Sequence, residues 1–135
     1  MSIGIGAIAN IIVKDDKTVM YEYGSYDLNN EMYRNENRIC DGILTINVCC
    51  FKEPEIHKKI KKMPSGRKRL ITKRIPISVD YSQMIEDRLI DIVNCSNCWK
   101  VNNSNIDVMV LRILPKLFEL YQVEGTIPEH ISYYI

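Results

Sequence analysis

Two thiol side chains, those of Cys95 and Cys98, have the spacing of a metal-binding or redox pair in the stretch NCSNCW (94–99). Two intervening residues allow both thiolates to reach one zinc ion, but a structural zinc site needs four ligands. A redox pair of the thioredoxin kind normally opens a helix, where the helix dipole lowers the thiol pKa, whereas this pair is expected to lead into a loop. The remaining zinc ligands would have to come from Cys40, Cys49, Cys50 and His57.

The zinc alternative has one set of ligands on paper, Cys50, His57, Cys95 and Cys98. Cys49 and Cys50 are neighbours on an expected strand and point to opposite faces, so only one of them could join. A second pair of closely spaced cysteines, which would make the pattern specific, is missing from the sequence. The pattern therefore favours small, buried, reduced cysteines, and we expect neither zinc nor another cofactor.

A strongly basic stretch, HKKIKKMPSGRKRLITKR (57–74), is the other candidate for a functional surface. It contains nine Lys or Arg and no acid, whereas the rest of the chain has nine bases and 17 acids, a net charge of −8. The whole chain carries only +1, so its charge is segregated rather than large. Such a segment suits an anionic partner if the protein's own acids do not fold back onto it. The residues that we expect to make this contact are Arg67, Lys68, Arg69, Lys73 and Arg74.

Two classes of anionic partner fit the basic stretch, an acidic protein surface and a nucleic acid. Nucleic-acid binding would use the same side chains and would weaken steeply with salt. Binding of single strands also needs aromatic side chains on which bases stack, and 57–74 contains none. Helix electrostatics would explain part of the charge, because Glu53 and Glu55 would begin a helix that ends in lysines. We therefore expect an acidic protein partner, with a nucleic acid as the alternative.

Catalytic signatures are missing from the sequence. No Walker motif or nucleophile elbow is present, and GIGA (4–7) lacks the third glycine of a dinucleotide-binding loop. A nucleophilic Cys–His pair would have to involve His57 or His130, and with five cysteines such pairings arise by chance. The sequence therefore favours a non-enzymatic binding module over the second alternative, an enzyme whose site is assembled from distant residues.

Patterns of apolar residues predict the elements that would carry these side chains. KDDK (14–17) separates two β-branched stretches and predicts a hairpin. RLIDIV (88–93) fits either a helix or a strand, and we assign it to a helix. Pro76 makes its strand an edge strand, and Pro115 should kink or split the last helix. The expected strands are 3–13, 18–24, 43–51, 69–79 and 130–135, and the expected helices are 53–63, 80–94 and a long one from 106 that ends at Gly125.

The order of these elements predicts a single α+β domain over residues 1–135. We expect a mainly antiparallel sheet of four or five strands with two or three helices packed on one face. Five cysteines, an odd number, and a start (MSIGIGAIANIIV) without a basic leader predict a cytoplasmic protein with reduced thiols. That start is also shorter than the roughly 20 apolar residues needed to cross a bilayer, so we expect no membrane association. The oligomeric state is left open.

Overall fold

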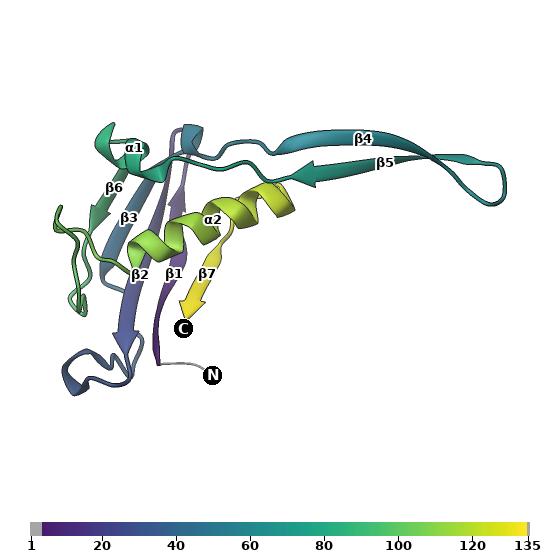
Figure 1. Cartoon of the computed structure of the whole chain (residues 1–135). Helices are drawn as coiled ribbons and strands as arrows, with labels where there is room; N and C mark the ends of the chain where they lie inside the picture. Colours follow the sequence, from purple (N-terminus) through teal and green to yellow (C-terminus); the bar gives the residue numbers. More distant parts are fainter. Residues whose placement is uncertain (1–3, 135) are drawn as a thin grey trace.

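The computed structural model describes residues 4–134, which fold as an α+β protein with two sheets and two α-helices (Figure 1). The strands are β1 (Ile5–Lys14), β2 (Thr18–Asp27), β3 (Gly42–Asn47), β4 (Glu55–Lys62), β5 (Lys68–Ile75), β6 (Ile90–Val93) and β7 (His130–Tyr134). The helices are α1 (Tyr81–Glu86) and α2 (Val110–Glu124), with short 3-10 turns η1 (Glu31–Tyr33) and η2 (Val48–Cys50). Ile3 and Ile135, predicted as strand ends, lie outside the described residues.

The main sheet has five antiparallel strands in the order β6-β3-β2-β1-β7. β1 and β2 form the predicted hairpin, and the Asp15 side chain holds their turn by accepting hydrogen bonds from the backbone N–H groups of Thr18 and Lys17, both at 2.7 Å. These two bonds hold the pKa of Asp15 below its ordinary value. The predicted last strand is also present, because β7 pairs with β1. The α+β class and the mainly antiparallel sheet are therefore confirmed.

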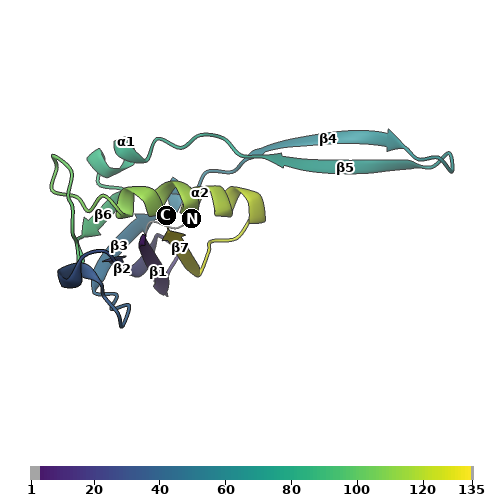
Figure 2. The same ribbon diagram turned by 60° about the horizontal axis from the view of Figure 1, so that its bottom comes forward.

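One face of the main sheet carries the hydrophobic core, because successive side chains of a strand point to opposite faces. On β2 the alternate residues Val19, Tyr21 and Tyr23 are fully buried. α2 lies over this face of the sheet (Figure 2) and ends where predicted, at Gly125, whose φ of 79° suits a glycine. The buried apolar side chains of α2 are Val110, Ile113, Leu114, Leu117 and Phe118.

Pro115 was predicted to kink or split the last helix, and it lies inside α2 without splitting it. It occupies the second turn, so only the Leu111 carbonyl loses its helical N–H partner. The turns on either side are fixed by side chains that are fully buried, Leu114 and Leu117. Packing of the apolar face outweighs the one lost hydrogen bond, because tertiary contacts supply most of the stability of a helix.

Two predicted elements end earlier than expected. The helix predicted over 80–94 stops after Glu86, and the helical prediction for 88–93 is wrong, because Ile90–Val93 form β6. Ile90 is buried opposite Ile46 of β3, so strand pairing decides between the two conformations that the sequence allowed. The strand predicted over 43–51 stops at Asn47, whose side chain accepts a hydrogen bond from the Cys49 N–H at 3.0 Å and caps η2.

The helix predicted over 53–63 is wrong, because β4 and β5 form a separate antiparallel hairpin. Ile56 and Ile60 are four residues apart, a spacing that places them on one side of a strand as well as of a helix. Every residue of β4 is exposed, so no core holds this segment in a helix. The hairpin extends away from the remainder of the protein in both views (Figures 1 and 2). We call residues 55–75 the arm and the other described residues the body.

Candidate functional site

The arm turns back on itself at its tip through the three-residue loop Pro64-Ser65-Gly66. The Gly66 N–H donates to the Met63 carbonyl at 2.9 Å, and the Met63 N–H donates to the Arg67 carbonyl at 2.7 Å. Pro64 occupies the second position of this turn, where proline is favoured because its ring fixes φ near −65°. Gly66 has a φ of 84°, a left-handed conformation that glycine adopts without strain. The sequence MPSGR therefore builds a hairpin with a bulged glycine rather than the end of a helix.

The two faces of the arm differ in chemistry. Directly opposed side chains of antiparallel strands share a face, and Ile60 is opposite Leu70. The face with this pair is called the aliphatic face, and its centre is open to solvent, with Ile60 65% and Leu70 58% exposed. It consists of Ile56, Lys58, Ile60 and Lys62 from β4 and Lys68, Leu70, Thr72 and Arg74 from β5. The other face, called the basic face, consists of Glu55, His57, Lys59, Lys61, Arg69, Ile71, Lys73 and Ile75.

Eight of the nine Lys and Arg residues in the arm form no ion pair with any residue of the described range 4–134. The ion pairs of the arm lie at its root, at the end nearest the body. There Arg74 lies 3.9 Å from the Glu53 carboxylate, and the His57 ring lies 3.4 Å from the Glu55 carboxylate. The acids of the body therefore leave most of the positive charge of the arm without a partner.

Like charges face each other across the distal half of the arm. Lys62 is directly opposite Lys68, and Lys61 is directly opposite Arg69. Directly opposed like charges destabilise a pair of strands. Packing offers little compensation, because each of these four residues is exposed. An anionic partner would relieve this repulsion, and the geometry of the arm is therefore suited to one.

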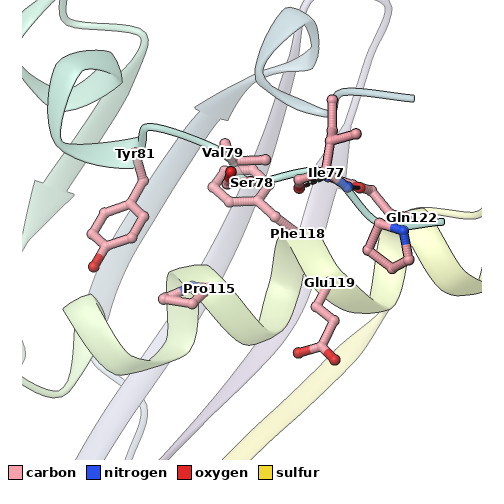
Figure 3. Close-up of a pocket in the computed structure, with 9 residues that line it drawn as sticks. Ile77, Ser78, Val79, Tyr81, Pro115, Phe118, Glu119 and Gln122 are labelled. Atoms are coloured by element: carbon pink, nitrogen blue, oxygen red, sulfur yellow. Dashed lines mark hydrogen bonds between the residues drawn. The ribbon is translucent and has the colours of Figure 1, made fainter. Parts of the chain in front are cut away.

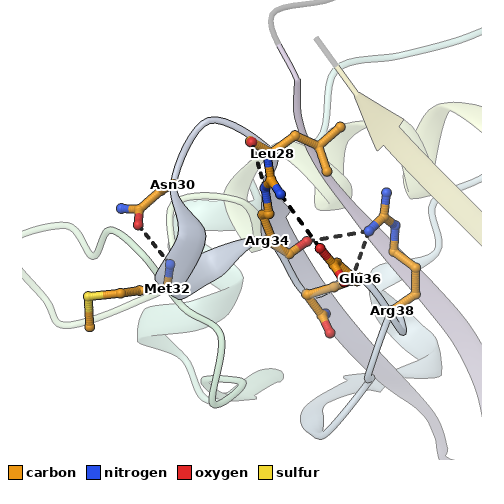
Figure 4. Close-up of polar contacts among 7 residues, drawn as sticks. Leu28, Asn30, Met32, Arg34, Glu36 and Arg38 are labelled. Atoms are coloured by element: carbon orange, nitrogen blue, oxygen red, sulfur yellow. Dashed lines mark hydrogen bonds and ion pairs between the residues drawn. The ribbon is translucent and has the colours of Figure 1, made fainter.

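Two arginines of the body, Arg34 and Arg38, have a different environment. Arg34 lies 3.6 Å from the Glu36 carboxylate, and Arg38 donates to the Asn35 carbonyl at 2.8 Å (Figure 4). The Arg38 guanidinium also lies 3.9 Å from the centre of the Tyr26 ring. These contacts order the loop between β2 and β3, so the two arginines serve local structure. Ion pairing alone does not separate the arm from the body, because Arg34 is the one Lys or Arg of the body in residues 4–134 that forms an ion pair. The arm differs because nine bases are concentrated on one projecting hairpin (Figure 1).

The root of the arm is fixed to the C-terminal half of α2. Gln122, which is 1% exposed, accepts from the Ile77 N–H at 2.6 Å and donates to the Ile77 carbonyl at 3.1 Å (Figure 3). The Arg74 Nε donates to the Gln122 carbonyl at 2.9 Å. Just before β4, Phe51 packs edge-on against the Tyr121 ring with the ring centroids 5.2 Å apart. Contacts at the roots of both strands therefore set the direction in which the arm extends.

The predicted contact residues fall into two groups. Those that are exposed on the arm are Arg67, Lys68, Arg69 and Lys73. Arg74 differs, because its guanidinium is held by α2 and Glu53 and its side chain is only 34% exposed, so it anchors the arm. Lys58 and Lys62 were missed as contact residues, because the expected helix accounted for their charge. The structure places them with Lys68 on the aliphatic face.

The cysteine pair lies in the body, in a turn where the Cys98 N–H donates to the Cys95 carbonyl at 3.2 Å. The Cys95 N–H donates to the Tyr23 hydroxyl, and that hydroxyl donates to the Asp107 carboxylate, both at 2.9 Å. Asp107 also accepts from the Met109 N–H at 2.9 Å, just before α2 begins. Burial raises the pKa of Cys95 and raises the pKa of Cys98 to about 11. Both thiols stay protonated at neutral pH, and the network is structural.

The four zinc candidates are not brought together. Within residues 4–134, no group of three or more His, Cys, Asp or Glu side chains is close enough to hold a metal ion. His57 lies on the arm, whereas the Cys50 thiol lies against the Leu89 carbonyl in the body. All five cysteines are free thiols.

A shallow hollow lies beside the root of the arm, between α2 and the segment that follows β5 (Figure 3). Its lining is mainly apolar and includes Ile77, Val79 and Phe118. The side-chain amide of Gln122 is buried, and both its oxygen and its nitrogen are already hydrogen-bonded to the backbone of Ile77. The other polar side chains of the lining are Ser78, Tyr81 and Glu119, and no hydrogen bond joins any two of them, so no acid–base pair is formed among them.

Comparison with known proteins adds no relative. The chain matches no protein-family model, and no curated protein or solved structure is similar enough to indicate a relationship. Within residues 4–134, neither helix has the length and apolar character that crossing a membrane requires.

Proposed function

We propose that this protein is a non-enzymatic binding module whose arm contacts an acidic surface of a protein partner. The supporting observation is one projecting hairpin that carries eight bases without ion pairs to residues 4–134 and has an exposed aliphatic stripe on one face. The stripe gains free energy only where a partner removes it from water. Lysines around it can cover apolar surface with their stems while their charged ends reach carboxylates. A partner that is both apolar and acidic satisfies both requirements.

A nucleic acid is the alternative partner, and the basic face favours it. A two-stranded ribbon fits the major groove of B-form DNA, and bases on both faces of the ribbon suit a groove bordered by phosphates. The rest of the chain opposes this assignment. The residues outside 57–74 carry a net charge of −8, and binding would hold this negative charge close to the phosphates. Nucleic-acid-binding domains are usually basic overall, whereas this chain carries +1.

The five free thiols support a reducing compartment, and we place the protein in the cytoplasm on that basis. Two of these thiols are buried in the body, Cys50 and Cys95. Burial raises the pKa of Cys50 to about 11, which protects the thiol from oxidation.

Fluorescence anisotropy with a labelled polyglutamate peptide, a stand-in for an acidic protein surface, tests the proposal. Lys62→Gln/Lys68→Gln should weaken binding about tenfold, because two charged contacts on one face are lost together. Lys17→Gln/Lys100→Gln is the matched control, since it removes the same charge from exposed positions of the body. It should change the affinity less than about twofold.

A duplex DNA oligonucleotide is the comparison probe. If the duplex binds more tightly than polyglutamate, and its affinity falls steeply with salt, nucleic-acid binding replaces the proposal. If neither probe binds at low salt, or if the arm and body variants lose affinity equally, the arm is not a binding surface for acidic partners.

A further inference from the structure

The main sheet has a second face, opposite the one that α2 covers, and we call it the outer face. Directly opposed residues of paired strands share a face, and two such rows cross β2, β3 and β6 on the outer face. One row is Met20, Thr45 and Asp91, and the other is Glu22, Ile43 and Val93. These six residues are called the outer patch.

The outer patch combines carboxylates with apolar side chains. Glu22 and Asp91 form no ion pair within the described part of the chain. Val93 beside them is 53% exposed. Among the described strand residues that face outward, none is Lys or Arg. Of the loop arginines, Arg38 lies over the Tyr26 ring, and Arg88 borders the same hollow as Asp91 without forming an ion pair with it in the described residues. The patch is therefore acidic and aliphatic, as the arm is basic and aliphatic.

The arm cannot cover the outer patch of its own chain. Gln122 and Arg74 tie the root of the arm to α2, which lies over the other face of the sheet. From that root the arm extends away from the body in both views (Figures 1 and 2). An arm that covers this patch must therefore come from another molecule.

We infer that the acidic partner of the arm is a second copy of this chain, whose outer patch receives the aliphatic face of the arm. This inference rests on the proposed function and names its partner. Eight residues in a strand span roughly 27 Å, and five strands about 4.8 Å apart span roughly 19 Å, so one arm is long enough to cross the main sheet. Two copies related by a twofold axis exchange arms, and each arm covers the outer patch of its partner.

The contacts follow from the two faces. Ile60 and Leu70 are the aliphatic centre of the arm, and they pack on Ile43 at the centre of the patch. Lys62 and Lys68, at the distal end of the same face, reach the carboxylates of the patch. This pairing also relieves the repulsion between the two opposed lysines.

Charge and area both favour a weak, reversible dimer. The basic stretch carries a net charge of +9 and the rest of the chain carries −8, so the whole chain carries only +1. Proteins with a net charge near zero associate readily. One face of a hairpin, about 10 Å wide, covers roughly 190 Å² on each side of a contact where it crosses a sheet roughly 19 Å across. Two reciprocal contacts then bury about 760 Å², which is in the range of weak, transient interfaces.

Sedimentation velocity of the full chain with paired charge reversals tests the inference. The face variant is Glu22→Lys/Asp91→Lys, and the arm variant is Lys62→Glu/Lys68→Glu. The arm variant keeps two like charges opposite each other, so the stability of the hairpin should change little. We expect wild type to dimerise at low salt and dissociate at high salt, each variant alone to be monomeric, and an equimolar mixture of the two variants to dimerise. Circular dichroism of each variant shows whether the fold is retained.

The remaining outcomes separate the two proposals. A wild type that stays monomeric at all concentrations overturns the second copy as partner, yet arm-dependent binding of polyglutamate would keep the proposed function. A face variant that dimerises like wild type, or a mixture that does not restore the dimer, overturns the docking of the arm on the outer patch. Loss of polyglutamate binding in the arm variant alone supports the proposed function whatever the oligomeric state.

Discussion

Reversing two charges on the arm should make its backbone more stable rather than less. Lys61 and Lys62 of β4 are directly opposite Arg69 and Lys68 of β5. The substitution Lys61→Glu/Lys62→Glu therefore converts two like-charge pairs into two opposite-charge pairs. Because every β4 side chain is exposed, these pairs account for a large share of the free energy of opening the arm.

The size of the effect can be worked out from cross-strand pair energies. An opposite-charge pair contributes roughly 0.2–1 kcal/mol, and a directly opposed like-charge pair costs a comparable amount. Two reversals then stabilise the closed hairpin by about 1–2 kcal/mol after allowance for solvent screening of exposed charges. A change of about 1 kcal/mol in the free energy of opening slows amide exchange roughly fivefold.

Hydrogen–deuterium exchange read by mass spectrometry measures this opening locally. An isolated two-stranded hairpin is marginally stable at best, so the wild-type arm should exchange far faster than β1 and β2. Peptides from residues 55–75 should gain protection in the variant, while peptides from the main sheet should not change. Low salt leaves the opposed charges least screened, but it also favours the inferred dimer, so the protein is diluted until sedimentation shows wild type to be monomeric.

Lys58→Glu/Lys59→Glu is the matched control, because it makes the same charge change on the same strand. The residues opposite Lys58 and Lys59 are Thr72 and Ile71, which carry no charge. Protection of the arm should therefore change much less in this control. Equal gains in both variants, or no gain in Lys61→Glu/Lys62→Glu, would refute the conclusion that opposed like charges destabilise the arm.

Three further predictions concern the body. Phe118→Ala should lower the free energy of unfolding in urea by about 3–5 kcal/mol, because the ring is 2% exposed and its loss leaves a cavity; a loss under about 1 kcal/mol would contradict this packing. Gln122→Ala removes both hydrogen bonds to Ile77, so it should lower the free energy of unfolding by about 1–3 kcal/mol and speed amide exchange in residues 76–79. Unchanged exchange in these residues would argue against Gln122 as an anchor of the arm. Timed alkylation with iodoacetamide at neutral pH, followed by mass spectrometry, should modify exposed Cys49 well before Cys98. The pKa of Cys98, about 11, keeps its thiol protonated, and the thiolate is the reactive form. Equal rates of modification would contradict the burial of Cys98.

The main sheet could be predicted from the sequence because each of its strands has a buried face. In TVMYEYG the alternate residues Val19, Tyr21 and Tyr23 are apolar, and all three are in the core. The Asp-rich turn before them fixes the hairpin by local hydrogen bonds to Asp15. Where the periodicity of apolar residues, the turn residues and burial agree, a sequence pattern is compatible with only one local structure.

The arm could not be predicted in this way, because burial does not constrain it. Ile56 and Ile60 fit one side of a helix or of a strand, and the residues on either side are lysines that are compatible with both. The decisive signal was local: Pro64 and Gly66 are spaced for a tight hairpin loop with a left-handed glycine. The helix predicted over 53–63 ends directly before this loop, and a helix there leaves no pairing between Lys62 and Lys68.

The polar groups that position the arm and the cysteine loop also left little trace in the sequence. Gln122 lies in an apolar helix pattern, and its role depends on Ile77, 45 residues earlier in the chain. Tyr23 looks like an ordinary core residue until its hydroxyl meets Asp107, 84 residues away. Long-range hydrogen bonds of this kind depend on how elements pack, which a pattern of neighbours in sequence does not specify.

Selection for stability alone would not produce the charge pattern of the arm. A solvated hairpin gains stability when opposite charges face each other, and the arm has like charges at the opposed positions of its distal half. It also leaves Ile60 and Leu70 exposed, although serine or threonine at these sites would avoid apolar exposure. Both features weaken the free arm and strengthen a complex in which carboxylates and apolar groups meet the same face. The cost in the free state is therefore the physical reason to expect a partner, and the outer patch offers the required carboxylates and apolar side chains within the same chain.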